Sequence, residues 1–263
     1  MKHNLSTNLY SLRFLSVSYA DKVKKTREIG YQSIQSGLPP DDMGLKNYKT
    51  LIDDLGIEIC TFSGPLLSIP SSPKDLIDAC HLFNCDEVMI GALPEEYRED
   101  YDSYMKGIDL FNTAARVLIK EGIYLSFHNH AQEFRKFNNG KRAIDLMFEN
   151  FDPKASRFLL DTHWIQSGGG DIFQWMEKCK GRMKFLHVKD YRIAPANYNT
   201  NIGTVDKQFT QIGDGQLPWD LIIKKGLEVG IEAFIVEQDF TYDDEPFDCM
   251  AQSFAKLKSL GLN

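Results

Sequence analysis

Four of the six histidines of this 263-residue chain lie close to acidic residues, in segments that follow short apolar runs. These segments, and one acidic segment near the C-terminus, contain His128, His130, Glu133, Asp161, His163, His187, Asp190, Glu237 and Asp239. Imidazole and carboxylate groups together are ligands for divalent cations such as Mn²⁺, Mg²⁺, Co²⁺ or Zn²⁺. An imidazole is also suited to proton transfer near neutral pH. The residue types therefore predict a divalent-metal site with an acid or base beside it.

Spacing indicates which of these side chains share a face. His128 and His130 are two residues apart, so in extended backbone they point to the same side while Asn129 points away. Lys189 stands in the same relation to His187. We expect Lys189 to face the site and contact a substrate hydroxyl, carboxylate or phosphate, the alternative being a solvated lysine at a strand end.

The segment around Asp161 has two interpretations for each residue. Asp161 is a candidate metal ligand, although an aspartate at a strand end is often only a helix N-cap. His163 lies on the same side if the strand continues, as a substrate contact or as a wall residue. Trp164 offers a flat wall for a sugar ring, and packing is the alternative. We expect His163 and Trp164 to bind substrate.

The elements that must position these residues alternate between apolar runs and longer amphipathic ones. The sequence predicts eight strands, at residues 8–13, 31–35, 58–62, 87–90, 123–128, 157–161, 184–188 and 233–237. It predicts eight helices between and after them, at residues 21–29, 46–55, 72–83, 102–120, 141–150, 172–179, 219–229 and 246–260. Nearly uniform apolar runs are typical of parallel strands covered on both faces. Eight such units predict a (β/α)₈ TIM barrel, with residues 1–263 as a single domain.

A doubly wound open sheet is the alternative fold, but no GxGxxG motif follows the first predicted strand. In a TIM barrel the active site lies at the carboxyl ends of the strands. Predicted strands five to eight end at or just before the histidines and acidic residues, so we expect those side chains to meet at one mouth. The polar segment 194–216 is interpreted as an insertion beside that mouth.

Composition limits the partners. The net charge of −7 argues against a nucleic-acid-binding protein, which normally carries a basic face. Five cysteines without a CxxC pair indicate reduced thiols and a cytoplasmic protein, and the N-terminus does not have the pattern of a signal peptide. No apolar run is long enough for a transmembrane helix, so no membrane partner is expected.

Six motifs, taken together and in order, resemble a known family. They are HNHAQEF at 128–134, LDTHW at 160–164, GGGD at 168–171, FLHVKDY at 185–191, IGDG at 212–215 and IVEQD at 235–239. The sequence resembles the xylose isomerase-like TIM-barrel superfamily and, within it, the sugar phosphate isomerase/epimerase branch. The resemblance implies a divalent metal held from strands five to eight. Carried onto this chain, the ligands are Glu133, Asp161, His187 and Glu237.

Strand five departs from the isomerase pattern, because His128 stands where ketose epimerases have a glutamate and Glu133 comes five residues later. Glu133 reaches the metal only if the loop folds back. The resemblance implies a sugar or sugar phosphate isomerase or epimerase that abstracts a proton next to a carbonyl, through an enediolate that the metal stabilises. We expect His128 or His130 to be the acid or base, with Glu133, Glu237 and Lys189 in the catalytic set.

Three other activities stay open. The same site suits a keto-sugar dehydratase or a 3-keto-glycoside lyase, because elimination begins with the same proton abstraction. An endonuclease acting at abasic sites belongs to the same superfamily, but the acidic charge argues against it. A non-catalytic sugar-binding barrel would be expected to have lost ligands. The expected partner is a small carbohydrate, and barrels of this type often form homo-oligomers.

Overall fold

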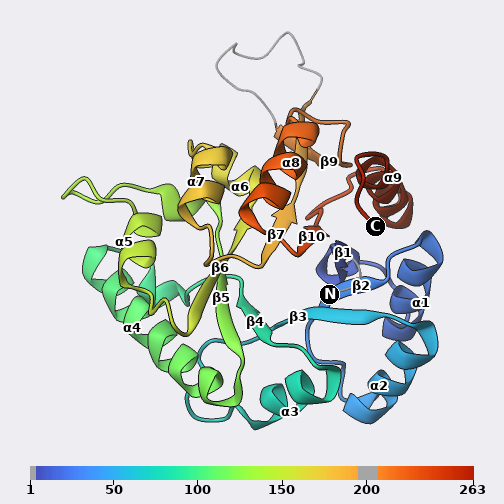
Figure 1. The fold of residues 1–263 in the computed structure, drawn as a ribbon, viewed down its shortest axis with the longest axis horizontal. Coiled ribbons are helices and arrows are strands. Elements are labelled where there is room, and N and C mark those ends of the chain that lie inside the picture. Colours follow the sequence, from blue (N-terminus) through green and yellow to red (C-terminus); the bar gives the residue numbers. More distant parts are fainter. Residues whose placement is uncertain (1–3, 195–206) are drawn as a thin grey trace.

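The computed structural model describes residues 4–194 and 207–263, which form a closed barrel of eight parallel strands (Figure 1). The barrel strands are β1 (Leu5–Asn8), β2 (Ser33–Ser36), β3 (Glu58–Ser63), β4 (Glu87–Ile90), β5 (Tyr124–His128), β6 (Ser156–Asp161), β7 (Phe185–Val188) and β10 (Ala233–Val236). Each strand pairs with the next along the chain, and β10 closes the barrel against β1. The predicted (β/α)₈ barrel is confirmed, and the open sheet is excluded.

Helices surround the barrel, as the outer ring in Figure 1 shows. They are α1 (Tyr19–Ile29), α2 (Gly44–Leu55), α3 (Lys74–Phe83), α4 (Tyr101–Leu118), α5 (Ala143–Asn150), α6 (Thr162–Ser167), α7 (Ile172–Lys178), α8 (Trp219–Val229) and α9 (Pro246–Ser259). Two helices, α6 and α7, lie between β6 and β7, so the strict alternation predicted there is wrong. In the described part of the chain, no helix has the length and apolar character needed to cross a membrane.

The first strand was predicted at residues 8–13, but it ends at Asn8. The side chain of Asn8 accepts a hydrogen bond from the backbone N–H of Tyr10 at 3.0 Å. This cap starts a 3₁₀ helix at Leu9–Leu12 in place of further strand, as short amide side chains commonly do. Asn8 therefore stands at the carboxyl end of β1, at the mouth of the barrel.

The interior of the barrel is apolar directly beneath the mouth. Six buried residues form a separate cluster there: Cys60, Met89, Leu159, Phe185, Ala233 and Ile235. Leu159, Phe185 and Ile235 lie two residues before Asp161, His187 and Glu237. Because strand side chains alternate, each apolar residue and the polar residue after it point to the same inner side. The polar residues at the mouth therefore rest on an apolar layer and are held away from bulk water.

Asp190 does not face the mouth as predicted, because it anchors the loop at residues 211–218. Its buried carboxylate accepts hydrogen bonds from the indole Nε1 of Trp219 at 2.5 Å and from five backbone N–H groups, those of Tyr191, Gly213, Gly215, Gln216 and Leu217. A Cβ on Gly215 would lie 2.1 Å from the Asp190 carboxylate, so only glycine fits there. This loop follows β9 (Lys207–Thr210), which pairs with β8 (Asp190–Ile193) as an antiparallel ribbon. Of the predicted insertion, residues 195–206 lie outside the described residues.

We predict that Asp190→Asn destabilises the fold by about 3 kcal/mol or more, because an NH₂ group would then face several buried donors. Urea unfolding measures this change in the free energy of unfolding. The control is Asp171→Asn, which alters an exposed N-cap that bonds the backbone N–H of Gln174. Asparagine caps helices as well as aspartate does, so we expect little change there. Equal effects of the two substitutions would contradict the role of Asp190.

Candidate metal centre and active site

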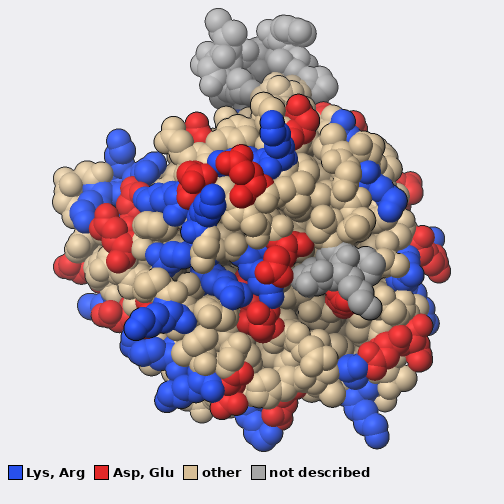
Figure 2. Space-filling view, in the orientation of Figure 1, with Lys and Arg blue, Asp and Glu red and all other residues tan. Residues whose placement is uncertain are grey.

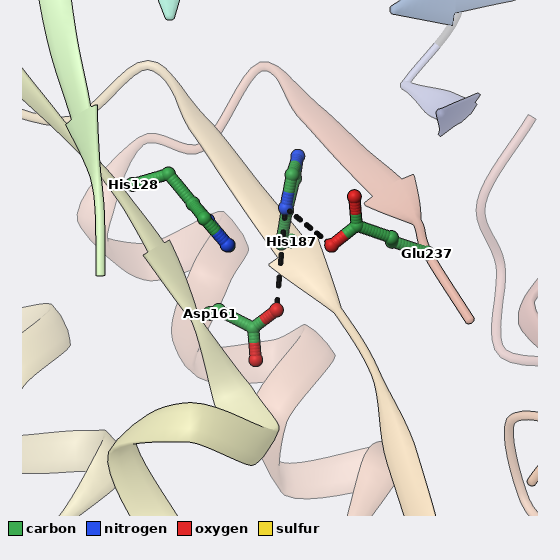
Figure 3. A group of neighbouring side chains, drawn as sticks. All are labelled: His128, Asp161, His187 and Glu237. Carbon is green, nitrogen blue, oxygen red and sulfur yellow. Dashed lines mark ion pairs between the residues drawn. The ribbon is translucent and has the colours of Figure 1, made fainter. Parts of the chain in front are cut away.

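Four side chains from adjacent barrel strands converge at the mouth (Figure 3). His128 ends β5, Asp161 ends β6, His187 lies in β7 and Glu237 follows β10. One ligand atom from each of the four lies within 4.8 Å of the others, and all four residues are buried. The Nδ1 atom of His187 is 3.3 Å from Oε2 of Glu237 and 4.0 Å from Oδ2 of Asp161. This arrangement has the donor set and spacing of a divalent-metal site.

Gln35, at the end of β2, determines which nitrogen of His187 faces the carboxylates. Its side-chain oxygen lies 2.7 Å from Nε2 of His187, while its amide nitrogen donates to Ser63 Oγ at 3.1 Å. Because the Gln35 oxygen can only accept, Nε2 of His187 carries the proton. In the neutral ring that binds a metal, Nδ1 then presents its lone pair to the carboxylate oxygens. A cation between these atoms removes that repulsion, and the residues present therefore fit a bound metal ion.

The charges at the mouth give a second test of whether these residues fit a bound metal ion. Lys189 is 1% exposed and its Nζ lies 2.7 Å from Glu237, 2.7 Å from Asp239 and 3.3 Å from Asp161. Burial opposes the charge of Lys189, but the three carboxylates outweigh it and raise its pKa. Three carboxylates and one ammonium sum to −3 + 1 = −2, which one divalent cation neutralises. Lys189 faces the site as predicted, although its Nζ already contacts carboxylates.

The pKa of Asp161 is raised and that of Glu237 is lowered, relative to the usual values of these carboxyl groups. Burial raises the pKa of Asp161 to about 6, although Lys189 and His187 partly offset this effect. Burial would also raise the pKa of Glu237, but Lys189 and His187 hold it well below its usual value. Asn8 donates to Glu237 Oε1 at 2.6 Å, which holds the carboxylate in place. Glu237 is therefore the firmly ionised member of the pair.

Asp161 serves the site and a helix at once. Its Oδ1 accepts the backbone N–H of Trp164 at 2.9 Å, which caps α6, while Oδ2 faces His187 and Lys189. The two interpretations of Asp161 are therefore compatible. Because α6 begins at Thr162, the strand does not continue to His163. His163 instead lies against the rings of Trp164, Tyr191 and Phe209, at centroid distances of 4.7, 5.1 and 4.9 Å.

Glu133 is outside the four-residue group, and His128 has the place that the resemblance gave to Glu133. Oε2 of Glu133 accepts the backbone N–H of His130 at 2.6 Å, so the loop folds back onto its own start. The side chain is fully buried, and burial raises its pKa to about 7. Phe134, the next residue, packs against Gly168 and Gly170, where an added Cβ would lie within 2.6 Å of its ring. The GGGD segment thus supports this loop.

His130 lies beside the four-residue group but is not a member of it. Its ring lies 4.8 Å from the His128 ring and 5.4 Å from Trp164. Burial lowers the pKa of His130 to about 4, with Lys189 adding to the effect, so the imidazole is neutral at physiological pH. A neutral imidazole can accept a proton.

The side chains surround a cavity of about 520 Å³, a size typical of small-molecule sites. His128, His130, Trp164, Glu237 and Asp239 line it, whereas His163 is not among its lining residues. Asn8 and Gln35 were not predicted as site residues. The sequence feature that could have identified them is a polar residue at the end of a short apolar strand. Asn8 was missed because the first strand was predicted to begin there instead of ending there.

A family model described as xylose isomerase-like TIM barrel matches residues 23–259. The chain belongs to this family. A sugar phosphate isomerase/epimerase from Parabacteroides distasonis has a similar structure, with a TM-score of 0.78 and 22% identity over 98% of this chain and 94% of that one. A xylose isomerase-like TIM barrel protein from Mycobacterium smegmatis, in complex with magnesium, has a TM-score of 0.71 and 15% identity over 98% of this chain and 96% of that one.

A curated relative is the inosose dehydratase of Salmonella agona (strain SL483), which is 26% identical over 123 residues. The match covers 43% of this chain and only 38% of the relative's own length. Members of the family are thus enzymes of more than one reaction class, among them isomerases, epimerases and dehydratases.

We predict that Glu133→Gln changes the pH dependence of stability. Burial raises the pKa of Glu133 to about 7 in the folded state. Between about pH 4.5 and 7, the folded protein therefore keeps a proton on Glu133, whereas the unfolded chain has lost it. Wild-type stability should therefore fall, relative to the variant, by about 2 kcal/mol from pH 5 to pH 8. Urea unfolding at both pH values measures this. The exposed Glu96→Gln should track wild type, and identical pH profiles for all three proteins would refute the prediction.

Proposed function

We propose that this protein is a divalent-metal-dependent enzyme that abstracts a proton next to the carbonyl group of a small carbohydrate. The observation that supports this most is the Nδ1 lone pair of His187, held by Gln35 toward the carboxylates of Asp161 and Glu237. We propose His128, Asp161, His187 and Glu237 as the metal ligands. The magnesium complex of the related Mycobacterium smegmatis protein is consistent with a divalent ion.

When bound, the ion would polarise the carbonyl group and stabilise the enediolate formed by proton loss. The chain's own residues do the rest. His130, which lines the cavity with a neutral ring, is the base. Glu133 positions His130 through its backbone N–H. Lys189 holds the carboxylates of Asp161, Glu237 and Asp239 in place with its ammonium, and Trp164 supplies a wall of the cavity.

Return of the proton to a neighbouring carbon gives isomerisation, and return to the other face gives epimerisation. Loss of a group from the β-carbon gives elimination instead. The position of Glu133 favours elimination. Its carboxylate holds the His130 backbone and is not available as a second proton carrier. The partial match to an inosose dehydratase agrees with elimination. A small carbohydrate is the proposed substrate in both cases.

The charge of the protein argues against a nucleic-acid substrate. On the face shown in Figure 2, Asp and Glu lie among the Lys and Arg side chains, so no continuous basic stripe is visible. The net charge of −7 acts in the same direction. We expect no cleavage of a duplex containing an abasic site.

We predict that His187→Ala abolishes Mn²⁺ binding and that Gln35→Ala weakens it about 10- to 100-fold, because the imidazole loses its orienting partner. Isothermal titration calorimetry measures both affinities. Gln35→Glu keeps an acceptor for Nε2 of His187 and should bind Mn²⁺ as tightly as wild type or more tightly. Unchanged affinity in Gln35→Ala would contradict the orienting role, and unchanged affinity in His187→Ala would contradict the metal site.

We predict that the Mn²⁺-loaded protein exchanges a carbon-bound hydrogen of a keto-sugar or 3-keto-glycoside with solvent deuterium, as measured by NMR. His130→Gln should slow this exchange by about 10²-fold or more while Mn²⁺ affinity is retained. The exposed His81→Gln serves as the control and should exchange at the wild-type rate. Absence of exchange with every sugar of such a panel, together with cleavage of an abasic duplex, would refute the proposed function.

A further inference from the structure

Exposed aromatic side chains gather at one side of the mouth. Among the described residues, four aromatic side chains are about half exposed or more: Tyr10 at 53%, Phe14 at 70%, Phe240 at 50% and Tyr242 at 48%. All four come from the segments that follow β1 and β10, which are neighbouring strands of the barrel. We refer to these four residues and Arg13 as the aromatic rim.

Arg13 holds the two segments of the rim together. Its guanidinium donates to the backbone oxygen of Asp239 at 2.7 Å and to that of Tyr10 at 3.0 Å. The same group lies 4.0 Å from the centre of the Tyr10 ring and 4.3 Å from that of Phe14. The rings of Phe14 and Phe240 stack at 5.7 Å with 22° between their planes. The rim is therefore an ordered surface whose rings are fixed outside the core.

The rim continues the proposed active site. The 520 Å³ cavity is lined at its buried end by His128 and Glu237 and at its exposed end by Tyr10, Arg13 and Phe240. A second hollow, of about 240 Å³, shares Asp239 and Phe240 with the first and is also lined by Phe14 and Tyr242. Phe240 thus belongs to both hollows. A ligand that extends outward from the carboxylates meets aromatic rings next.

A single sugar bound over the carboxylates would leave these rings in water. Grouped apolar side chains on a soluble surface commonly mark a binding site. Aromatic faces bind the apolar C–H face of a sugar ring or another aromatic ring. The hydrogen bonds of Arg13 go to the backbone oxygens of Tyr10 and of Asp239, the neighbour of Phe240, so Arg13 fixes the rings. The chemistry of this surface thus fits an uncharged ring.

We infer that the aromatic rim is a subsite for a second ring, and that the substrate is a glycoside. The carbonyl-bearing sugar lies over the carboxylates, and the ring of its aglycone packs against Tyr10 and Phe240. This inference rests on the proposed function and narrows its substrate class. The aglycone ring is either a second sugar or an aromatic group, which share the flat apolar face that the rim recognises.

Matched glycosides test the subsite. The probes are the methyl and phenyl β-D-glucopyranosides, the corresponding galactosides, cellobiose and lactose, titrated into the Mn²⁺-loaded protein by calorimetry. We expect at least one ring-bearing glycoside to bind about tenfold more tightly than the methyl glycoside of the same sugar. Preference for the phenyl glycosides would identify an aromatic aglycone, and preference for the disaccharides a second sugar. Equal affinities throughout, or no binding by any ring-bearing probe, would overturn the inference.

Variants of the rim locate the effect. Tyr10→Ala and Phe240→Ala should remove most of the tenfold preference and keep wild-type Mn²⁺ affinity, which also shows that they fold. Leu221→Ala is the control, because Leu221 is 51% exposed on α8 and does not line either hollow. Retention of the preference in both rim variants would overturn the inference. So would a change of oligomeric state in gel filtration without a change in glycoside affinity, since the rim would then be a protein interface.

The failure of this inference is distinguishable from failure of the proposed function. If keto-sugars exchange deuterium but ring-bearing glycosides bind no better than methyl ones, the proposed function stands and the second-ring subsite does not. If His187→Ala keeps full Mn²⁺ affinity, the metal site fails whatever the glycosides do.

Discussion

The interaction on which the rest of the mouth depends is the pairing of buried carboxylates with cations. Asp161 and Glu237 rest on the apolar interior of the barrel, where an uncompensated carboxylate would be protonated or would destabilise the fold. Lys189 supplies one positive charge at 2.7 Å from Glu237. With Asp239 as the third carboxylate, the charge that remains is −3 + 1 = −2, which a divalent ion would neutralise. The electrostatic requirement that makes the site costly to fold would therefore also favour a doubly charged cation.

Strand periodicity explains how one short sequence serves both the site and the scaffold. In the HVKD segment, His187 and Lys189 turn toward the mouth, while Val188 lies in the outer apolar core and Asp190 anchors the backbone of the following loop. Asp161 combines the two tasks in one side chain, with one oxygen capping α6 and the other facing the site. The position of the ligands and the path of the loops around them are therefore set by the same residues.

The barrel and the location of the site could be predicted from the sequence because both depend on local patterns. Apolar runs at regular intervals mark buried parallel strands, and chemically active residues after four consecutive strands must meet at one end. The start of the chain could not be predicted as well, since the cap formed by Asn8 is a single hydrogen bond that ends an otherwise extended segment. Gln35 and Asn8 reach the site through partners more than 150 residues away, at His187 and Glu237, and spacing within the sequence carries no signal for such contacts.

His128, and not Glu133, belongs to the four-residue group, and this difference affects the proposed chemistry as well as the metal site. A glutamate at the end of β5 would add a third carboxylate to Asp161 and Glu237, whereas His128 adds a neutral ligand, because burial and the neighbouring His187 lower its pKa well below the usual value. The proposed ligand set then carries two negative charges instead of three, and a bound divalent ion would remain a stronger Lewis acid. Glu133 is outside the proposed ligand set, and its buried carboxylate accepts the backbone N–H of His130. His128 on β5 would thus reduce the charge around a bound metal ion, while Glu133 holds the backbone of the proposed base, His130.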